Sequence, residues 1–245
     1  MQWLAAPETL SIDEGVVHVW RAPLDPPEMT VARLAETLSE DERQRANRFV
    51  FERDRRRFTV ARGVLRSLLA RYLGSSPDRL RFSYGPFGKP GLAEGSGTGP
   101  LCFNASHSGD LALYAVTVGR EVGVDVERIR SNFALEQVAE RFFSPREVAA
   151  LRDLAPENRP LGFFNCWTRK EAYIKARGAG LSLPLDRFDV SLAPGEPAAL
   201  LTTLDDPGEA SRWSLRALSL ESGTVAALAV TAPLGELRCW QWTGK

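Results

Sequence analysis

The spacing of apolar and polar residues predicts two long helical regions in this chain. In residues 39–72 and again in residues 161–177, apolar side chains recur every three or four positions, the period of a helix with one buried face. The second region stops at Gly178, and glycine is common just past a helix end. Short runs rich in β-branched residues predict strands at residues 16–20, 101–103, 111–118 and 122–127, and a hairpin over residues 213–231.

Turn-forming residues separate these elements. Residues 74–100 are turn-rich, and within them the Gly-Ser-Gly-Thr-Gly-Pro stretch at residues 95–100 has the composition of a surface loop. Residues 104–109 also have turn composition, between two predicted strands. Ser144 and Glu147 have the spacing of a capping box, with Pro145 at the first helical position, and so predict another helix start.

A tight turn at Gly119 lies near the middle of the chain. We place a boundary there, between an N-terminal half of residues 1–118 and a C-terminal half of residues 119–245. Helices combined with antiparallel hairpins, rather than alternating βαβ units, indicate an α+β fold.

The strand at residues 122–127 and the second helical region carry the candidate chemistry. Because strand side chains alternate, Asp125 and Glu127 share one face. Helical i, i+4 spacing places Trp167, Glu171 and Lys175 along one stripe. Three carboxylates and a lysine suit a phosphate-handling Mg²⁺ site, because Mg²⁺ takes oxygen ligands and keeps several waters. Taken singly, each charge fits a solvated strand face or a surface ion pair equally well.

Composition narrows the classes of protein to consider. Acidic and basic residues balance at 31 each, so no broad basic surface for nucleic acid or membrane is expected. The cysteines Cys102, Cys166 and Cys239 are far apart in apolar surroundings, which favours free thiols in a reducing compartment. Residues 1–7 lack the basic and apolar pattern of a signal peptide. We expect a cytoplasmic monomer, with His18 in a structural role.

The order of several motifs carries more information than any one of them. A basic helix from Arg57-Phe58 to Arg66 is followed by Phe87-Gly88-Lys89-Pro90, Phe103-Asn104-Ala105-Ser106-His107-Ser108, Gly123-Val124-Asp125-Val126-Glu127, Arg141-Phe142-Phe143-Ser144, Trp167 to Lys175, and Gly178-Ala179-Gly180-Leu181. This series covers most of the chain and resembles the Sfp-type 4'-phosphopantetheinyl transferases, in the branch whose late motif reads W...KEA.

The resemblance implies both a fold and an activity. The fold would consist of two pseudo-symmetric halves, each a small antiparallel sheet with a packed long helix, with the active cleft between them. The family moves the phosphopantetheine arm of coenzyme A onto a serine of an apo acyl or peptidyl carrier protein, and adenosine 3',5'-bisphosphate is released.

The resemblance also implies a set of coenzyme A contacts. It places Arg45 and Arg57 against the coenzyme phosphates, Lys89 in a stiff turn as a further cation, and His107 at the 3'-phosphate with Ser106 beside it. Arg57 shares a helix face with apolar residues, so its charge needs a counter-charge at the edge of the core.

For the reaction, we expect Mg²⁺, or alternatively Mn²⁺, to be held by Asp125, Glu127 and Glu171. Both strand acids would face a wet cleft. Val126 offers only its carbonyl, so water would complete the ligand set. Glu171 is also the candidate base for the serine hydroxyl, and Lys175 would steady or protonate the leaving phosphate.

Two other classes remain open on sequence alone. One is a coenzyme A or carrier-protein binding module without catalysis, which the presence of all three acids and Lys175 disfavours. The other is a magnesium-dependent nuclease or phosphatase, which the balanced charge disfavours. A serine hydrolase is excluded for Ser106 and His107, because no G-x-S-x-G elbow surrounds the serine.

The carrier protein is expected to dock after Glu127, on residues 133–151. There, apolar side chains and neighbouring arginines could receive an acidic helix, while an ordinary core and cap role is equally open for these residues: Phe133, Leu135, Val138, Arg141 and Arg146.

Overall fold

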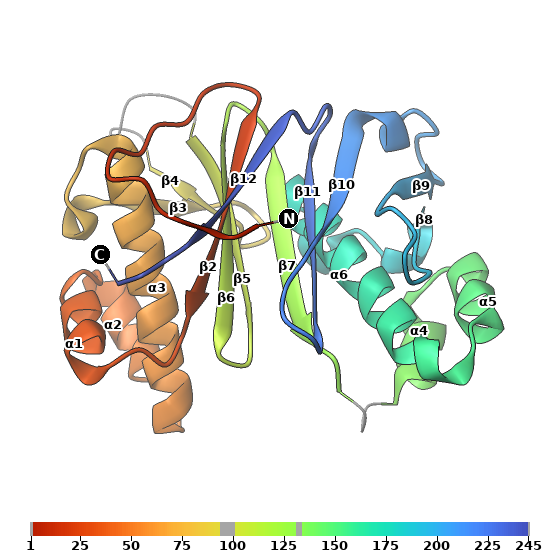
Figure 1. Ribbon diagram of the computed structural model, residues 1–245, viewed down its shortest axis with the longest axis horizontal. Helices are drawn as coiled ribbons and strands as arrows, with labels where there is room; N and C mark the ends of the chain where they lie inside the picture. Colours follow the sequence, from red (N-terminus) through yellow and green to blue (C-terminus); the bar gives the residue numbers. More distant parts are fainter. Residues whose placement is uncertain (1, 94–100, 131–133, 245) are drawn as a thin grey trace.

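The computed structural model describes residues 2–93, 101–130 and 134–244, and it confirms the α+β fold (Figure 1). The larger sheet has the strand order β1 (Leu4–Ala5), β12 (Glu236–Gln241), β2 (Val16–Pro23), β6 (Leu111–Val118) and β5 (Leu101–Ser108). The smaller sheet has the order β10 (Trp213–Leu218), β11 (Thr224–Thr231) and β7 (Val122–Arg128). Two short hairpins pair β3 (Phe82–Tyr84) with β4 (Pro90–Leu92) and β8 (Phe188–Val190) with β9 (Leu200–Thr203).

Helices cover the outer faces of the two sheets (Figure 1). The helices on the side of the larger sheet are α1 (Glu28–Glu36), α2 (Glu40–Ala46) and α3 (Glu52–Leu73). Those on the side of the smaller sheet are α4 (Leu135–Phe142), α5 (Pro145–Asp153) and α6 (Arg159–Arg177). None of the described helices is long and apolar enough to cross a membrane.

Three apolar cores hold these layers together. One lies between α3 and the larger sheet, where Leu68 and Trp20 are buried. A second lies between the facing sheets, where Val19 of β2 and Val124 of β7 belong to one cluster. The third lies between α6 and the smaller sheet. Since both faces of β2 and β7 are covered, both strands are buried along most of their length.

The larger sheet differs from the antiparallel sheet expected in each half. β12 runs parallel to β2, from Glu236 opposite Val16 to Gln241 opposite Arg21, and β1 runs parallel to β12. The sheet is therefore mixed, and a strand from the end of the sequence completes it. The smaller sheet is antiparallel throughout, as expected.

The helical region predicted over residues 39–72 and the strand predicted at residues 101–103 both differ from the structure. The helical region predicted over residues 39–72 is two helices, because Phe51 has extended backbone angles and forms the N-cap of α3. The strand predicted at residues 101–103 continues to Ser108, so residues 104–108 are not a turn. They pair with β6 from Asn104 opposite Ala115 to Ser108 opposite Leu111, and this pairing overrides their turn composition.

The helix-end predictions for α5 and α6 are confirmed. Ser144 Oγ accepts a hydrogen bond from Glu147 N at 3.2 Å, and Ser144 N donates to Glu147 Oε2 at 2.9 Å, which is the reciprocal capping box. α6 begins two residues before the predicted start and ends at Arg177. Gly178 follows with φ of 63°, the left-handed conformation that glycine adopts without strain.

Candidate active site

Alternate side chains of β5 reach across to the acids of β7. Ser106 Oγ donates a hydrogen bond to Asp125 Oδ1 at 2.7 Å, and Ser108 Oγ donates to Glu127 Oε2 at 2.8 Å. Ser106 and Ser108 share a strand face, as do Asp125 and Glu127, so the two pairs meet in register. The predicted sharing of one face by the two acids is therefore confirmed, and the larger sheet positions both carboxylates.

Asp125 is buried, with 3% of its surface exposed, so the prediction that both acids face a wet cleft is wrong for this residue. Its Oδ1 lies 2.6 Å from Lys175 Nζ, which also donates to Ser106 Oγ at 3.0 Å. Burial raises the pKa of the Asp125 carboxyl, and the Lys175 ammonium opposes that rise. Glu127, by contrast, is partly exposed.

Gly123 lets α6 approach β7 closely enough to bring these groups together. A Cβ at this position would lie 2.1 Å from Ala172 O and 2.4 Å from Ala176 N, both on α6. Any larger residue would force the helix away from the strand. The glycine therefore sets the distance between the strand acids and the helix that carries Glu171 and Lys175.

Glu171, on the helix side, is electrostatically coupled to Asp125 and Glu127, and these three carboxylates are referred to below as the acidic cluster. Burial is the largest cause of its raised pKa, followed by the negative charges of Asp125 and Glu127. Trp167, one turn earlier on the same stripe, packs against Phe163 with ring centres 6.1 Å apart. Trp167 thus packs against the core, and Glu171, one turn further along the helix, presents its carboxyl group.

The donor set fits a hard divalent cation. Asp125 Oδ2 is buried and has no hydrogen-bond partner in the described part of the chain, and the pKa values of Asp125, Glu127 and Glu171 are all raised, chiefly by burial. Buried carboxylate oxygens that lack other partners are suited to bind a divalent cation that takes oxygen ligands, such as Mg²⁺. In the observed side-chain arrangement, no group of three or more His, Cys, Asp or Glu among the described residues is placed to hold a metal ion. Metal ligation by the three acids thus stays a prediction.

A cavity of about 500 Å³ lies between α2, α3 and residues 105–107 of β5. Its lining combines cationic, aromatic and hydroxyl-bearing side chains, among them Arg45, Arg62, Phe49, Tyr84, Ser106 and His107. Because Ser106 also contacts Asp125 and Lys175, the cavity and the acidic cluster share a wall.

Comparison with known proteins decides the family. The model of the 4'-phosphopantetheinyl transferase superfamily matches residues 121–231, and that of the 4'-phosphopantetheinyl transferase N-terminal region matches residues 23–119. The chain is 45% identical over 240 residues to the 4'-phosphopantetheinyl transferase HetI of Nostoc sp. (strain PCC 7120), covering 98% of each chain. The chain belongs to the 4'-phosphopantetheinyl transferase superfamily.

More distant members of the superfamily match as well. The 4'-phosphopantetheinyl transferase Sfp of Bacillus subtilis (strain 168) is 32% identical over 160 residues, covering 65% of this chain and 69% of the relative. The phosphopantetheinyl transferase of Thraustochytrium sp. is 30% identical over 217 residues, covering 84% and 74%. The resemblance to Sfp-type transferases is thereby confirmed. A solved holo-[acyl-carrier-protein] synthase of Thermotoga maritima overlaps 48% of this chain and 64% of its own, with a TM-score of 0.36 and 23% identity.

In this phosphopantetheinyl transferase, the cavity brings together three of the five predicted coenzyme residues, namely Arg45, Ser106 and His107. Partial burial is the largest cause of the lowered pKa of His107, and the positive charges of Lys175 and Arg57 lower it further. The neutral imidazole is therefore favoured near pH 7.

The other two, Arg57 and Lys89, contact protein groups. Arg57 forms an ion pair with Asp25 (Nη2 to Oδ2, 2.7 Å), which supplies the expected counter-charge. Lys89 Nζ donates to Ala176 O at 2.5 Å and to Val122 O at 3.3 Å, and so ties the turn before β4 to α6 and β7. A phosphate contact by either residue would have to replace these interactions, so their coenzyme role stays a prediction.

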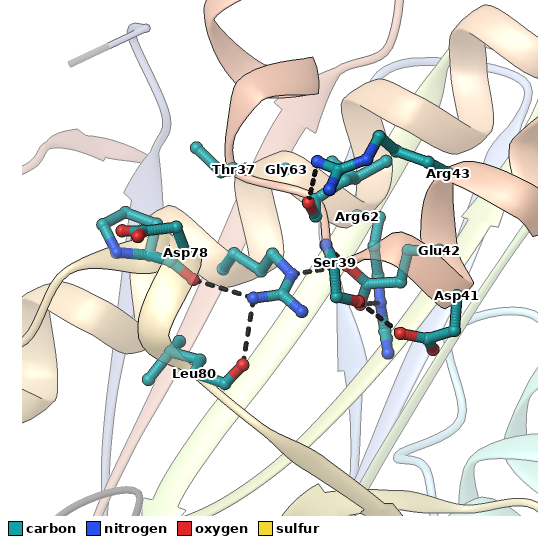
Figure 2. A network of polar contacts seen from close by, with 12 residues as sticks. Thr37, Ser39, Asp41, Glu42, Arg43, Arg62, Gly63, Asp78 and Leu80 are labelled. Atoms are coloured by element: carbon teal, nitrogen blue, oxygen red, sulfur yellow. Dashed lines mark hydrogen bonds and ion pairs between the residues drawn. The ribbon is translucent and has the colours of Figure 1, made fainter.

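A buried charge network that the sequence did not predict contributes Glu42 and Arg62 to the wall of the cavity (Figure 2). Glu42 is buried and paired with Arg62 and Arg66. Arg66 also donates to Pro77 O at 2.8 Å and to Leu80 O at 3.1 Å. The signal was present, since Ser39 and Glu42 have capping-box spacing and Ser39 N donates to Glu42 Oε2 at 2.9 Å.

Proposed function

We propose that this protein transfers the 4'-phosphopantetheine group of coenzyme A to a serine of an apo acyl or peptidyl carrier protein. The position of Ser106 is the main support for this proposal. It lines the cavity that contains Arg45 and His107, and it contacts Asp125 and Lys175 of the acidic cluster. A ligand whose phosphates occupy the cavity thus reaches the groups suited to phosphoryl chemistry. The enzyme family of the chain supports the same reading.

In the proposed reaction, the carrier serine oxygen attacks the β-phosphorus of coenzyme A. The new bond joins the serine oxygen to phosphorus, the bond to the bridging oxygen breaks, and adenosine 3',5'-bisphosphate leaves. Arg45 and His107 would bind the adenosine-side phosphates. Residues 1–118 would thus supply the coenzyme contacts, and residues 119–245 the acids and Lys175.

The acidic cluster would serve the chemical step. Asp125, Glu127 and Glu171 would hold Mg²⁺, or Mn²⁺, which when bound neutralises charge that develops on the phosphates. Glu171 has a raised pKa, which suits a group that accepts the proton of the serine hydroxyl. Lys175 Nζ lies at the wall shared with the cavity and would donate a hydrogen bond or a proton to the leaving phosphate.

A binding module without catalysis is less well supported. Such a module would need the cavity but not a buried carboxylate with an unpaired oxygen, whose burial is costly without a partner. The chain keeps Asp125 in this costly state together with Glu127, Glu171 and Lys175. We place the reaction in the cytoplasm and expect a monomer, and both of these stay predictions.

Carrier docking on α4 and α5 also stays a proposal. Leu135 and Val138 are half-buried against the core, so much of their surface is already used. Phe133 lies outside the described residues. Arg146 is well exposed, with only a 3.4 Å contact to Asp189, and it is the best-placed cation for an acidic carrier helix. Arg141 lies over the Phe142 ring.

A direct experiment tests the proposed activity. The protein is incubated with coenzyme A, Mg²⁺ and a panel of apo carrier proteins, and the products are weighed by mass spectrometry. We expect at least one carrier to gain a single phosphopantetheine, and a variant with its acceptor serine changed to alanine to gain none. If no carrier gains mass while adenosine 3',5'-bisphosphate still binds, the binding-module alternative is favoured instead.

A further inference from the structure

Exposed aromatic rings line the cavity from two different parts of the fold. Phe49, in the connection between α2 and α3, is 38% exposed, and Tyr84, at the end of β3, is 50% exposed. Large apolar side chains left in contact with water are a feature of binding surfaces when they gather at one site. Phe51, in the same connection as Phe49, is 68% exposed but does not line the cavity.

Both rings are held in place by neighbours. The Phe49 ring packs against Phe58 with centres 5.4 Å apart, and the Arg45 guanidinium lies 5.4 Å from the Phe58 ring centre. The Tyr84 hydroxyl accepts a hydrogen bond from Arg62 Nη2 at 2.6 Å. Arg62 is in turn fixed by the buried Glu42 (Figure 2). Ordering these rings before a ligand arrives lowers the entropy cost of binding.

The chemistry of the cavity selects a particular kind of ligand. Arg45 attracts phosphate and the neutral His107 ring can donate a hydrogen bond to it, whereas Asp41, which also lines the cavity, repels phosphate and accepts hydrogen bonds. Ser39 Oγ donates to Asp41 Oδ1 at 2.6 Å, which fixes one of its oxygens. A ligand that carries both phosphates and a planar ring with hydrogen-bond donors would satisfy all of these groups.

We infer that Phe49 and Tyr84 form a stacking site for the adenine base of coenzyme A, and that they determine recognition of the adenosine end. This inference rests on the proposed function, because it takes coenzyme A as the ligand of the cavity. Stacking on aromatic side chains is a common way to bind a base, since every base has a π-face. The acceptor Asp41 then favours a base with an exocyclic amino group.

The test measures binding without the transfer reaction. Dissociation constants are determined calorimetrically for adenosine 3',5'-bisphosphate and for 1-O-methylribose 3,5-bisphosphate, the same ligand with its base removed. The proteins are wild type, Phe49→Ala, Tyr84→Ala and Tyr84→Phe, with Phe51→Ala as the matched control from the same connection.

For the base-containing ligand, Phe49→Ala and Tyr84→Ala should each raise Kd by about tenfold, or about 1.4 kcal/mol. Neither should change Kd for the base-free ligand more than about twofold, which is within roughly 0.4 kcal/mol. Tyr84→Phe keeps the ring and should retain most of the affinity, and Phe51→Ala should match wild type. Equal losses for both ligands, or no loss for either, would overturn the stacking site.

The transfer assay separates this inference from the proposed function. In it, Phe49→Ala should raise KM for coenzyme A and leave kcat unchanged. A wild-type protein that transfers phosphopantetheine while Phe49→Ala binds adenosine 3',5'-bisphosphate normally would overturn the stacking site alone. A wild-type protein that shows the stacking effect without any transfer would overturn the proposed function alone.

Discussion

Replacing Lys170 by Met should destabilise the protein through the loss of one buried ion pair. The side chains of Lys170 and Glu147 are 0% and 2% exposed, and Nζ lies 2.8 Å from Glu147 Oε2. Lys170 Nζ also donates to Leu185 O at 2.6 Å and to Phe188 O at 2.5 Å. One ammonium therefore joins α6 to α5 and to the segment that leads into β8.

The size of the effect follows from what remains after the substitution. Glu147 would keep its backbone donors, Ser144 N at 2.9 Å and Val190 N at 2.8 Å, but would lose the ammonium, and the buried carbonyls of Leu185 and Phe188 would lose this donor. Removing one partner of a buried pair costs about 3–5 kcal/mol. In a chain of this size that corresponds to a fall in Tm of roughly 6–20 °C, at about 2–4 °C per kcal/mol.

Urea unfolding followed by circular dichroism at pH 7 measures this loss, and a matched double variant shows its cause. Glu147→Gln combined with Lys170→Met removes the unpaired charge and should be more stable than Lys170→Met alone. Burial raises the pKa of Glu147, and loss of Lys170 raises it further. A carboxyl with a raised folded-state pKa favours folding at low pH, so the deficit of Lys170→Met should shrink between pH 7 and pH 5. A loss under about 1 kcal/mol, or a deficit that does not change with pH, would show that the buried Lys170–Glu147 pair does not stabilise the fold in this way.

Three further predictions concern separate parts of the molecule. His107→Ala should lose most of the preference for coenzyme A over 3'-dephospho-coenzyme A, measured as the ratio of the two Kd values; an unchanged ratio would place the 3'-phosphate site elsewhere. Burial lowers the pKa of His18 from 6.5 to about 4, so the unfolded chain takes up a proton that the folded chain does not, and stability should fall as pH drops from 6.5 towards 4. His18→Asn should flatten that slope in urea unfolding series at each pH, and equal slopes in both proteins would exclude His18 as the cause. Arg146→Glu should raise KM for the carrier protein at unchanged coenzyme A affinity; an unaltered carrier KM would move the docking surface away from α5.

The sequence predicted those features that depend on local pattern. Helical period, the Gly178 stop and the Ser144 capping box located α5 and α6, and alternation placed Asp125 and Glu127 on one face. The features that it missed depend on contacts between distant segments. Asn is a common turn residue, yet Asn104 lies in a strand. Its Oδ1 accepts a hydrogen bond from Val124 N at 2.9 Å, so its polar side chain joins the two sheets.

The burial of Asp125 and its contact with Lys175 also depend on contacts between distant segments. Both depend on how closely α6 packs on β7 at Gly123, a distance that neither segment specifies alone. The parallel pairing of β12 with β2 likewise joins residues more than 200 positions apart. The strand propensity of each segment does not predict such pairings, because the packing of the whole fold determines which strands pair.

The acids of β7 and α6 are proposed to support phosphopantetheine transfer by holding Mg²⁺, and a Mg²⁺ titration of the transfer rate tests this proposal. The transfer rate to an apo carrier protein is measured against free Mg²⁺ for wild type and for Asp125→Asn, which has nearly the same shape but no charge. We predict that the wild-type rate saturates with Mg²⁺ and disappears in excess chelator. For Asp125→Asn we predict a rate lower by about 100-fold or more, corresponding to about 2.7 kcal/mol of lost transition-state stabilisation, with a folded circular dichroism spectrum. A near-normal rate for Asp125→Asn at limiting Mg²⁺ would show that Asp125 does not hold the metal ion.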